Sequence, residues 1–232
     1  MRLFVTGTDT DVGKSVITAC LAAAARAHGT VVACKPVASG VAPGTPGDDA
    51  TRIARGAGHA PLVFATWAPP VSPHRAAWLE GRPVPSDLLD RVQALRADTV
   101  LVEGAGGWRV PVAAPSPASP VQEVVWMRDL AAATGGPCVV VAADKLGVLN
   151  HTLLTVEAIQ RDGFDVLGVV LNQGMRPADD ASTSSNEADL RWLLDVPLAT
   201  APHVPDGPAA EAVWADVGQQ LFEALGVVRS GA

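Results

Sequence analysis

The hydrophobic residues of this chain gather in short uninterrupted runs, separated by longer stretches with helical spacing. Because apolar residues fill these runs without alternating with polar ones, both faces of each strand should be buried, as in a parallel sheet covered by helices. The pattern therefore predicts an α/β fold with a mostly parallel sheet flanked by helices. The predicted strands are Leu3–Val5, Val31–Cys34, Val100–Val102, Cys138–Ala143, Val166–Leu171 and a weaker Pro197–Ala201.

The stretches between these strands predict helices, and in the last one apolar residues recur at every fourth position from Ala209 to Leu225. No repeat or linker divides the chain, so we expect residues 1–232 to form a single domain, with the proline-rich pieces as loops. The predicted helices are Lys14–His28, Asp48–Ala57, Pro85–Ala97, Val121–Thr134, Leu149–Asp162, Thr183–Leu194 and Pro208–Leu225. The predicted loops are Ala42–Gly47, Pro69–Pro73 and Pro111–Pro120.

The stretch Gly7–Ser15, GTDTDVGKS, joins the first predicted strand to the first predicted helix. Its small residues let the loop fold back, so that backbone N–H groups and the helix N-terminus attract phosphate. Lys14 would reach the β- and γ-phosphates, and the Ser15 hydroxyl would ligate Mg²⁺. Thr8 stands where the Walker pattern has its first glycine, and the alternative is a chance glycine-rich turn. The flanking strand and helix favour a P-loop NTPase-like fold with a nucleotide triphosphate site.

Charged, polar and glycine residues directly follow the predicted strands. In an open parallel sheet, ligands bind beyond the carboxyl ends of the strands. We therefore expect these residues to converge on one edge of the sheet. After the phosphate loop they are Lys35, Pro36–Gly40, Glu103, Gly104–Gly107, Asp144, Lys145, Asn172 and Pro202.

Acidic residues in two parts of the chain, one after a predicted strand and one at a predicted helix start, are candidates to hold a metal ion. Glu103 follows the apolar run TVLV, where a nucleotide-binding sheet usually supplies its acidic metal partner. Together with Ser15 and one further acid, it would complete the protein's share of a Mg²⁺ shell. Asp48 and Asp49 both stand at the start of a predicted helix, and Asp48 fits a helix N-cap. Asp49 is thus the second metal candidate.

Lys35 lies between an apolar strand and a proline, where we expect it to be partly buried beside Lys14. Two ammonium groups near one point repel each other unless an anion lies between them, which suits a negatively charged reaction centre. The alternative is a lysine whose stem packs on the strand while its head reaches solvent. Asn172, at the end of another strand, either offers its amide to a nucleotide base or forms a turn.

Composition narrows the classes of partner. The chain has 232 residues, of which 48% are hydrophobic, so it can bury a sizeable core and is not disordered. Its net charge is −7 with scattered Lys and Arg, which argues against nucleic acid or an anionic membrane as partner. Without a bilayer-length apolar run or room for a signal peptide, we expect a cytoplasmic protein. Cys20, Cys34 and Cys138 lack CxxC spacing and are interpreted as reduced core residues.

Taken together, the motifs resemble those of the dethiobiotin synthetases. The phosphate loop alone is shared with many ATPases, whereas KPVASG and VEGAGGW in one chain are specific. The likeness runs to about Asn172 and then thins towards Pro202. The motifs are GTDTDVGKS, CKPVASG (Cys34–Gly40), GDDA (Gly47–Ala50), SPH (Ser72–His74), VEGAGGW with a following VP (Val102–Pro111), KLGVLNH (Lys145–His151) and VLN (Val170–Asn172).

The resemblance implies ATP-dependent ring closure in biotin biosynthesis. In that family, 7,8-diaminononanoate and CO₂ form a carbamate, ATP phosphorylates it, and the second amine closes the cyclic urea of dethiobiotin, releasing ADP and phosphate. Lys14 and Lys35 would then be catalytic, and Mg²⁺ would be held by Ser15, Asp49 and Glu103. The family's site spans a homodimer interface, where KLGVLNH reaches the partner's substrate.

The resemblance also assigns binding residues. Substrate contacts would come from Thr10, Ser39, Gly106 and Asn150. Nucleotide contacts would come from Asp11, Val12, Gly13, Lys14, Ser15, Val16, Glu103, Gly104, Ala105, Gly106, Asn172 and Pro202, with Asn172 at the base.

Two departures and several rival functions accompany this resemblance. Ser15 replaces the family's usual threonine, and Asp11 stands where glutamate is frequent. The partition and septum-site ATPases share the fold but carry a second lysine where this chain has Asp9. An amidotransferase of the cobyrinate-diamide type would need a glutaminase domain, for which no length is left, and a plain small-molecule kinase stays open.

Overall fold

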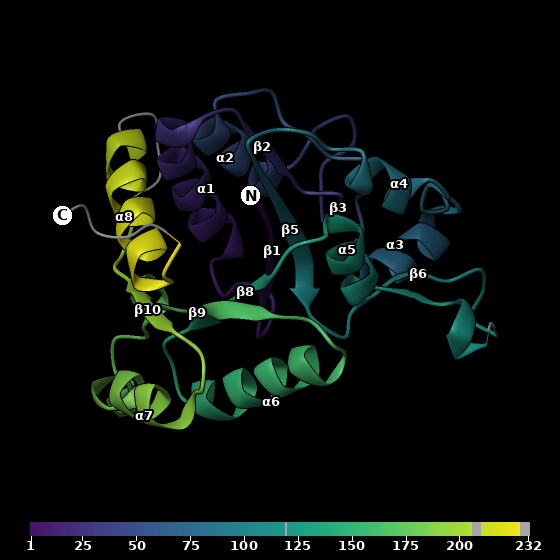
Figure 1. The fold of residues 1–232 in the computed structure, drawn as a ribbon. Coiled ribbons are helices and arrows are strands. Elements are labelled where there is room, and N and C mark those ends of the chain that lie inside the picture. The colour runs from purple at the N-terminus through teal and green to yellow at the C-terminus, as the bar shows by residue number, and fades with distance from the viewer. Residues whose placement is uncertain (119, 206–209, 228–232) are drawn as a thin grey trace.

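A six-stranded parallel sheet organises the molecule (Figure 1). The computed structural model describes residues 1–118, 120–205 and 210–227. All neighbouring strands in this sheet run parallel, in the order β10-β9-β8-β1-β5-β2, and each predicted strand is present. The strands are β1 (Arg2–Gly7), β2 (Val31–Cys34), β5 (Thr99–Gly107), β8 (Cys138–Ala143), β9 (Val166–Asn172) and β10 (Leu198–Ala201). The predicted fold class is confirmed.

Helices cover both faces of this sheet and create two hydrophobic cores. Successive side chains of a strand point to opposite faces, so Leu3 and Val5 join one core while Phe4 joins the other. Helices α1, α2 and α8 cover the first face, and α4–α7 the second (Figure 1). The helices are α1 (Lys14–Ala25), α2 (Asp48–Ala57), α3 (Pro73–Glu80), α4 (Leu88–Gln93), α5 (Met127–Thr134), α6 (Val148–Arg161), α7 (Asn186–Leu193) and α8 (Glu211–Ala224).

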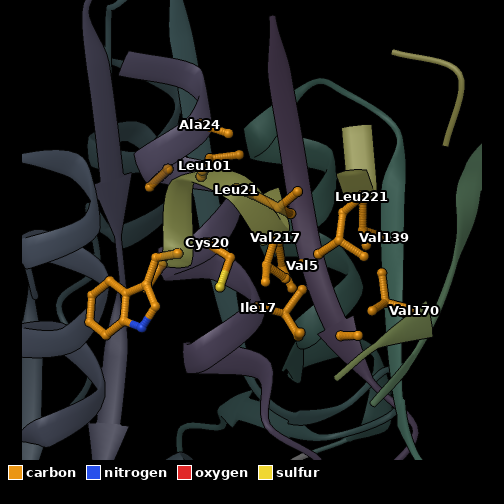
Figure 2. Close-up of a cluster of buried hydrophobic side chains, with 14 of the residues drawn as sticks. Val5, Ile17, Cys20, Leu21, Ala24, Leu101, Val139, Val170, Val217 and Leu221 are labelled. Carbon is orange, nitrogen blue, oxygen red and sulfur yellow. The ribbon is translucent and has the colours of Figure 1, made fainter. Parts of the chain in front are cut away.

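Two glycines let α2 and α8 approach α1 closely. A Cβ atom on Gly56 would lie 2.4 Å from the Ala19 carbonyl oxygen, and one on Gly218 would lie 2.0 Å from that of Cys20. Figure 2 shows Cys20 of α1 near Val217 of α8 in this core. All three cysteines are buried and free, as expected. The helix that carries the phosphate loop is therefore fixed on both sides.

The predicted helix Val121–Thr134 is wrong in its first half. A short 3-10 turn (Val121–Glu123) and strand β7 (Val125–Trp126) precede α5, and β7 pairs with β6 (Pro111–Ala113), which was predicted as loop. The Asp129 carboxylate accepts a hydrogen bond from the Trp126 N–H at 2.7 Å, and this cap fixes the helix start at Met127.

Other boundaries also differ from the predictions. Asp48 is not an N-cap, because Gly47, with φ 83°, takes that position and Asp48 is the first helical residue. Helix α3 was not predicted, although Ser72 at its N-cap and Pro73 at N1 form a typical helix start. The parallel pair β3 (Val37–Ser39) and β4 (Ala65–Trp67), which precedes α3 in the chain, was not predicted either. Predicted residues Pro208 and Ala209 of the last helix lie outside the described residues.

The predicted helix Asp48–Ala57 is confirmed at both ends as α2, and Leu149–Asp162 matches α6 with a shift of one residue. Three other predicted helices are shorter in the structure. The first ends in a 3-10 turn at Arg26–His28, the third is confined to α4, and the sixth begins with the 3-10 turn Ala181–Ser184. In α8, Trp214 and Phe222 complete the buried face, whereas Val213 is 40% exposed.

Candidate active site

The phosphate loop between β1 and α1 has the backbone that its glycines allow. Gly13 has φ 89°, and Asp11, with φ 53°, is the one non-glycine residue with positive φ in the described chain. A Cβ atom on Gly7 would lie 2.8 Å from Val12 Cγ2 and 2.9 Å from the Asp9 carbonyl oxygen. The loop therefore closes over Gly7, which explains how Thr8 can occupy the place of the first Walker glycine.

Lys14 begins α1 and points back over the loop. Its ammonium donates to the Asp9 carbonyl oxygen at 2.7 Å. Burial, and next the positive charge of Lys35, lower the pKa of Lys14 to about 8, although nearby carboxylates oppose this. An anion beside Lys14 would relieve both effects, so the loop is electrostatically prepared for phosphate.

Lys35 follows β2 and is 4% exposed. Its ammonium lies 2.5 Å from Glu103 Oε1 and 3.0 Å from Asp49 Oδ2. Burial alone would lower the pKa of Lys35, but the two carboxylates and their hydrogen bonds raise it above its ordinary value. The alternative of a head group reaching solvent is wrong, and Lys35 is a buried, paired cation.

The three predicted metal ligands come together around this cation. Glu103, in β5, is fully buried, and its Oε1 accepts from the Ser15 hydroxyl at 2.8 Å. Asp49, in the first turn of α2, has a 47% exposed side chain. Burial alone would raise the pKa of Asp49, but Lys35 and hydrogen bonds with Ser15 and Lys35 lower it.

This group of oxygens fits a hard cation. In the described part of the chain, Glu103 Oε2 is buried without a hydrogen-bond partner, an arrangement that a bound cation would satisfy. No group of three or more His, Cys, Asp or Glu side chains that could hold a metal lies among residues 1–118, 120–205 and 210–227. Ser15, Asp49 and Glu103 supply one hydroxyl and two carboxylates, so water and phosphate oxygens would have to complete a Mg²⁺ shell there.

A cavity of about 430 Å³ opens beside these groups. Lys14 and Lys35 both line it, as expected from the prediction that the two lysines lie near each other at one edge of the sheet. Ser39 Oγ is buried and has no partner within the described residues, which leaves it available to a ligand. The lining is Thr10, Asp11, Lys14, Lys35, Ala38, Ser39, Asp49, Pro70, Val71, Ser72, Pro73, Ala105, Gly106 and Val110.

Comparison with known proteins decides the family. An ATP-dependent dethiobiotin synthetase of Anaeromyxobacter dehalogenans (strain 2CP-1 / ATCC BAA-258) is 43% identical over 213 residues, covering 88% of this chain and 91% of that protein. Its counterpart in Rhodococcus jostii (strain RHA1) is 47% identical over 175 residues, covering 73% and 72%. The chain belongs to the dethiobiotin synthetase family. A family model described as an AAA domain also matches residues 1–206.

A solved structure supports the fold alone. The septum site-determining protein MinD of Pyrococcus horikoshii OT3, complexed with Mg-ADP, has a TM-score of 0.52 and 15% identity, covering 98% of this chain and 96% of that one. At this identity the likeness supports the P-loop architecture and says nothing of the reaction. No helix in the described residues is long and apolar enough to cross a membrane.

Several residues that the dethiobiotin synthetase resemblance assigned to binding do not line the cavity, and Asn172, Asn150 and Pro202 lie outside both the phosphate loop and β5. Asn172 Nδ2 donates to the Val12 carbonyl oxygen at 3.0 Å, and its Oδ1 accepts from Gly174 N–H at 3.1 Å. Asn172 therefore forms a turn and also holds the phosphate loop. Asn150 is exposed in the first turn of α6, and Pro202 is exposed after β10.

The other residues assigned to nucleotide binding lie in or next to the phosphate loop and in the last part of β5. Val12 is buried and Val16 packs against the first core, so their backbone is what can face a nucleotide. Gly104 and Ala105 continue β5 beyond Glu103, and the Gly104 carbonyl oxygen lies 3.4 Å from the Lys35 ammonium.

Reasoning from sequence missed the contribution of α3 to this site. Ser72 and Pro73, at the start of α3, line the cavity together with Pro70 and Val71. The Ser-Pro pair at N-cap and N1 was the available signal, because proline is frequent at the first helical position. The helix N-terminus thus faces the same cavity as the two lysines.

Proposed function

We propose that this chain catalyses ATP-dependent closure of a cyclic urea from 7,8-diaminononanoate and CO₂, giving dethiobiotin, ADP and phosphate. The observation that carries the proposal is that Lys14, Lys35, Ser39 and Asp49 line the same cavity. The chain that holds this cavity is a member of the dethiobiotin synthetase family. The reaction involves three anions or developing anions: a carbamate, a transferring phosphoryl group and a leaving phosphate. Buried cations are the groups that stabilise such anions during the reaction.

The reaction proceeds in three bond-forming steps. One amine of the substrate adds to CO₂ and loses a proton, which forms the N–C bond of a carbamate. A carbamate oxygen attacks the γ-phosphorus, and ADP leaves, which gives a carbamic-phosphoric anhydride. The second amine then attacks the carbonyl carbon, loses a proton and expels phosphate, so that the ring closes.

The lysines steady charge through these steps. Lys14, at the phosphate loop, holds the β- and γ-phosphate oxygens, since its buried ammonium has no carboxylate in hydrogen-bond contact among the residues that the structure describes. Lys35, which directly follows β2, faces the same cavity and holds the carbamate and the transferring phosphoryl group. Positioning and positive charge supply most of the catalysis in phosphoryl transfer, and no protein nucleophile is needed.

Magnesium would be held by the Ser15 hydroxyl and the carboxylates of Asp49 and Glu103, with phosphate oxygens and water completing its shell. When bound, it neutralises charge on the phosphates. The substrate contacts are assigned to Thr10, Ser39 and the backbone at Gly106, all of which line the cavity. The nucleotide base is assigned from the family resemblance to the surface near Asn172 and Pro202. These two segments lie together, since a Cβ atom on Gly174 would lie 3.3 Å from the Pro202 carbonyl oxygen.

We further propose that the active protein is a homodimer whose partner supplies Asn150. Asn150 is exposed in the first turn of α6, outside the cavity of its own chain. Leu146 and Leu154 flank it and are 77% and 58% exposed, apolar side chains that a second copy would cover. We expect residues 1–232 to act as one domain in this assembly, in the cytoplasm.

Product analysis tests the reaction. Purified protein is incubated with the diamine, bicarbonate, Mg²⁺ and ATP, and the products are identified by mass. We expect the cyclic urea with equimolar ADP and phosphate. A stable phosphorylated product would indicate a kinase, glutamine-dependent ammonia transfer would indicate an amidotransferase, and ATP hydrolysis stimulated by DNA or lipid without response to diamine would indicate a partition-type ATPase. Each of these results rejects the proposal.

Subunit mixing tests the shared site. Lys35→Ala and Asn150→Ala proteins should each be inactive, but mixed dimers contain one intact site if the two residues come from different subunits. Random mixing should restore about a quarter of the wild-type rate. No recovery after verified subunit exchange would place both residues in the same subunit's site.

A further inference from the structure

Asp144 is a fully buried carboxylate at the carboxyl end of β8, and the reaction described above does not use it. It lies on the sheet edge that carries the site, next to Lys145 and Leu146. Its backbone N–H donates to the Asn172 carbonyl oxygen at 3.1 Å, so β8 and β9 end side by side. A buried carboxylate is retained only with partners that satisfy it.

The partners of Asp144 come from two other segments. Arg176 Nε lies 2.5 Å from Asp144 Oδ2, and Asn186 Nδ2 donates to Oδ1 at 2.8 Å. Arg176 follows the turn after β9, and Asn186 is the first residue of α7. One carboxylate therefore joins the end of β8, the turn after β9 and the start of α7.

The turn after β9 lies directly on the phosphate loop. A Cβ atom on Gly13 would lie 2.0 Å from Asn172 Nδ2 and 3.7 Å from Met175 Cγ. Asn172 also accepts from Gly174 and donates to Val12. Since Arg176 is the next residue after Met175, its ion pair with Asp144 holds this turn against the loop.

The segment after β8 is tied to the same group of contacts. The Leu146 N–H donates to Asp180 Oδ2 at 2.6 Å, and Asp180 Oδ1 accepts from the Ser182 N–H at 3.0 Å. Asn186 Nδ2 lies 3.2 Å from Ser182 Oγ. A shift of the turn after β9 would take Arg176 away and leave the buried Asp144 carboxylate without its cation, with Asn186 as its remaining side-chain partner.

We propose that Asp144 is a positioning residue that couples the turn 172–176, over the phosphate loop, to the segment 145–150. Nucleotide binding then orders residues 145–150 through the Asp144–Arg176 pair. The inference rests on the proposed function in one respect, namely that 145–150 is the segment that reaches substrate. A buried ion pair that only stabilised the fold would show no such response to nucleotide.

Hydrogen exchange with and without nucleotide tests this coupling. The full chain is measured with and without saturating Mg²⁺ and AMPPNP, and exchange is followed in peptides covering 145–150. We expect nucleotide to slow exchange of 145–150 in the wild type. In Asp144→Asn we expect no slowing, even at nucleotide concentrations that saturate the variant. We also expect its dissociation constant for AMPPNP to rise about tenfold. Absence of nucleotide-dependent protection in the wild type overturns the proposal.

Two further variants separate coupling from structure. Asp98→Asn removes a carboxylate that accepts from Thr30, far along the chain and outside the cavity, and should leave the protection of 145–150 unchanged. Arg176→Gln tests the same pair from its 37% exposed side, should Asp144→Asn fail to fold. The single variants and the double variant Asp144→Asn/Arg176→Gln should lose similar affinity, because they break the same link. Additive losses would contradict the coupling.

These measurements need no diamine and no turnover. A protein that makes no cyclic urea but loses nucleotide-dependent protection in Asp144→Asn keeps the coupling and rejects the proposed reaction. A protein that makes cyclic urea but keeps the wild-type protection pattern in Asp144→Asn and Arg176→Gln rejects the coupling alone.

Discussion

The surroundings of Lys14 and Lys35 are electrostatic opposites, although both lysines line one cavity. Lys14 bonds a backbone carbonyl, and burial with the Lys35 charge lowers its pKa to about 8. Lys35 pairs with Glu103 and Asp49, which raise its pKa against the effect of burial. The ammonium of Lys14 is thus not neutralised by a contacting carboxylate of the described residues before any ligand binds. The ammonium of Lys35 already contacts two carboxylates. We infer that the phosphate loop is built to capture an anion and that the β2–β5 edge is built to hold a cation in place for chemistry.

The largest expected effect separates binding from turnover. Lys35→Ala should lower kcat by about 1,000-fold and leave AMPPNP binding detectable, because Lys35 stabilises charge that develops in the reaction. Lys14→Ala should weaken nucleotide binding as well. Calorimetric titration and steady-state kinetics measure the two effects. Near-normal turnover in Lys35→Ala would remove this residue from the mechanism.

The next effect is on stability without ligand. Lys35→Met leaves Glu103 buried and unpaired, and should lower the free energy of unfolding by about 3 to 5 kcal/mol. Adding Glu103→Gln should restore most of this loss, since the uncompensated charge is then gone. Urea unfolding measures both variants, with the exposed Lys145→Met as control. Equal stability of the single and double variants would show that the pair carries no net interaction.

Lys14→Met should change stability in the opposite direction. A pKa lowered from 10.5 to about 8 means that the folded state disfavours the charged form. Replacing it by a neutral side chain at pH 7 should raise the free energy of unfolding by up to about 3 kcal/mol. Urea unfolding at low ionic strength is the measurement. A loss of stability similar to that of Lys35→Met would mean that the two lysines are equivalent in the ligand-free protein.

The smallest effect is a proton taken up on binding. Well below pH 8, Lys14 is largely protonated already, so this group takes up almost no proton when ATP binds there. Above pH 8 the free protein loses this proton, and phosphate, by stabilising the ammonium, should draw it back, so affinity falls as pH rises through the free-state pKa. Titration calorimetry in buffers of different ionisation enthalpy counts the protons. Uptake that persists in Lys14→Met would assign it to another group.

The fold was predictable where the sequence repeats a physical signal. Six continuous apolar runs indicate buried parallel strands, and Lys35, Glu103 and Asn172 directly follow three of them. The parts that failed depend on local competition. The Trp126–Asp129 cap shortens a predicted helix, and β6 pairs with β7 in a proline-rich segment.

The pairing at the site could not be predicted, because it depends on strand order. Cys34 lies opposite Val102 in the register of β2 and β5, and this places Lys35 beside Glu103. The sequence gives neither the neighbour of β2 nor this register. For the same reason Asn172 was assigned to a base or a turn, and its bond to Val12 was not foreseen. Convergence on an edge was therefore predictable, and the contacts within it were not.

We propose that carbamate and ATP react in the one cavity that Lys14 and Lys35 both line. Bicarbonate labelled with ¹⁸O tests it in a single turnover with diamine, Mg²⁺ and ATP, followed by mass analysis of the released phosphate. We predict phosphate with one ¹⁸O atom, because the carbamate oxygen that attacks the γ-phosphorus leaves with phosphate when the ring closes. Cyclic urea formed together with unlabelled phosphate, under conditions where the bicarbonate keeps its label, would contradict transfer of the γ-phosphoryl group to a carbamate oxygen.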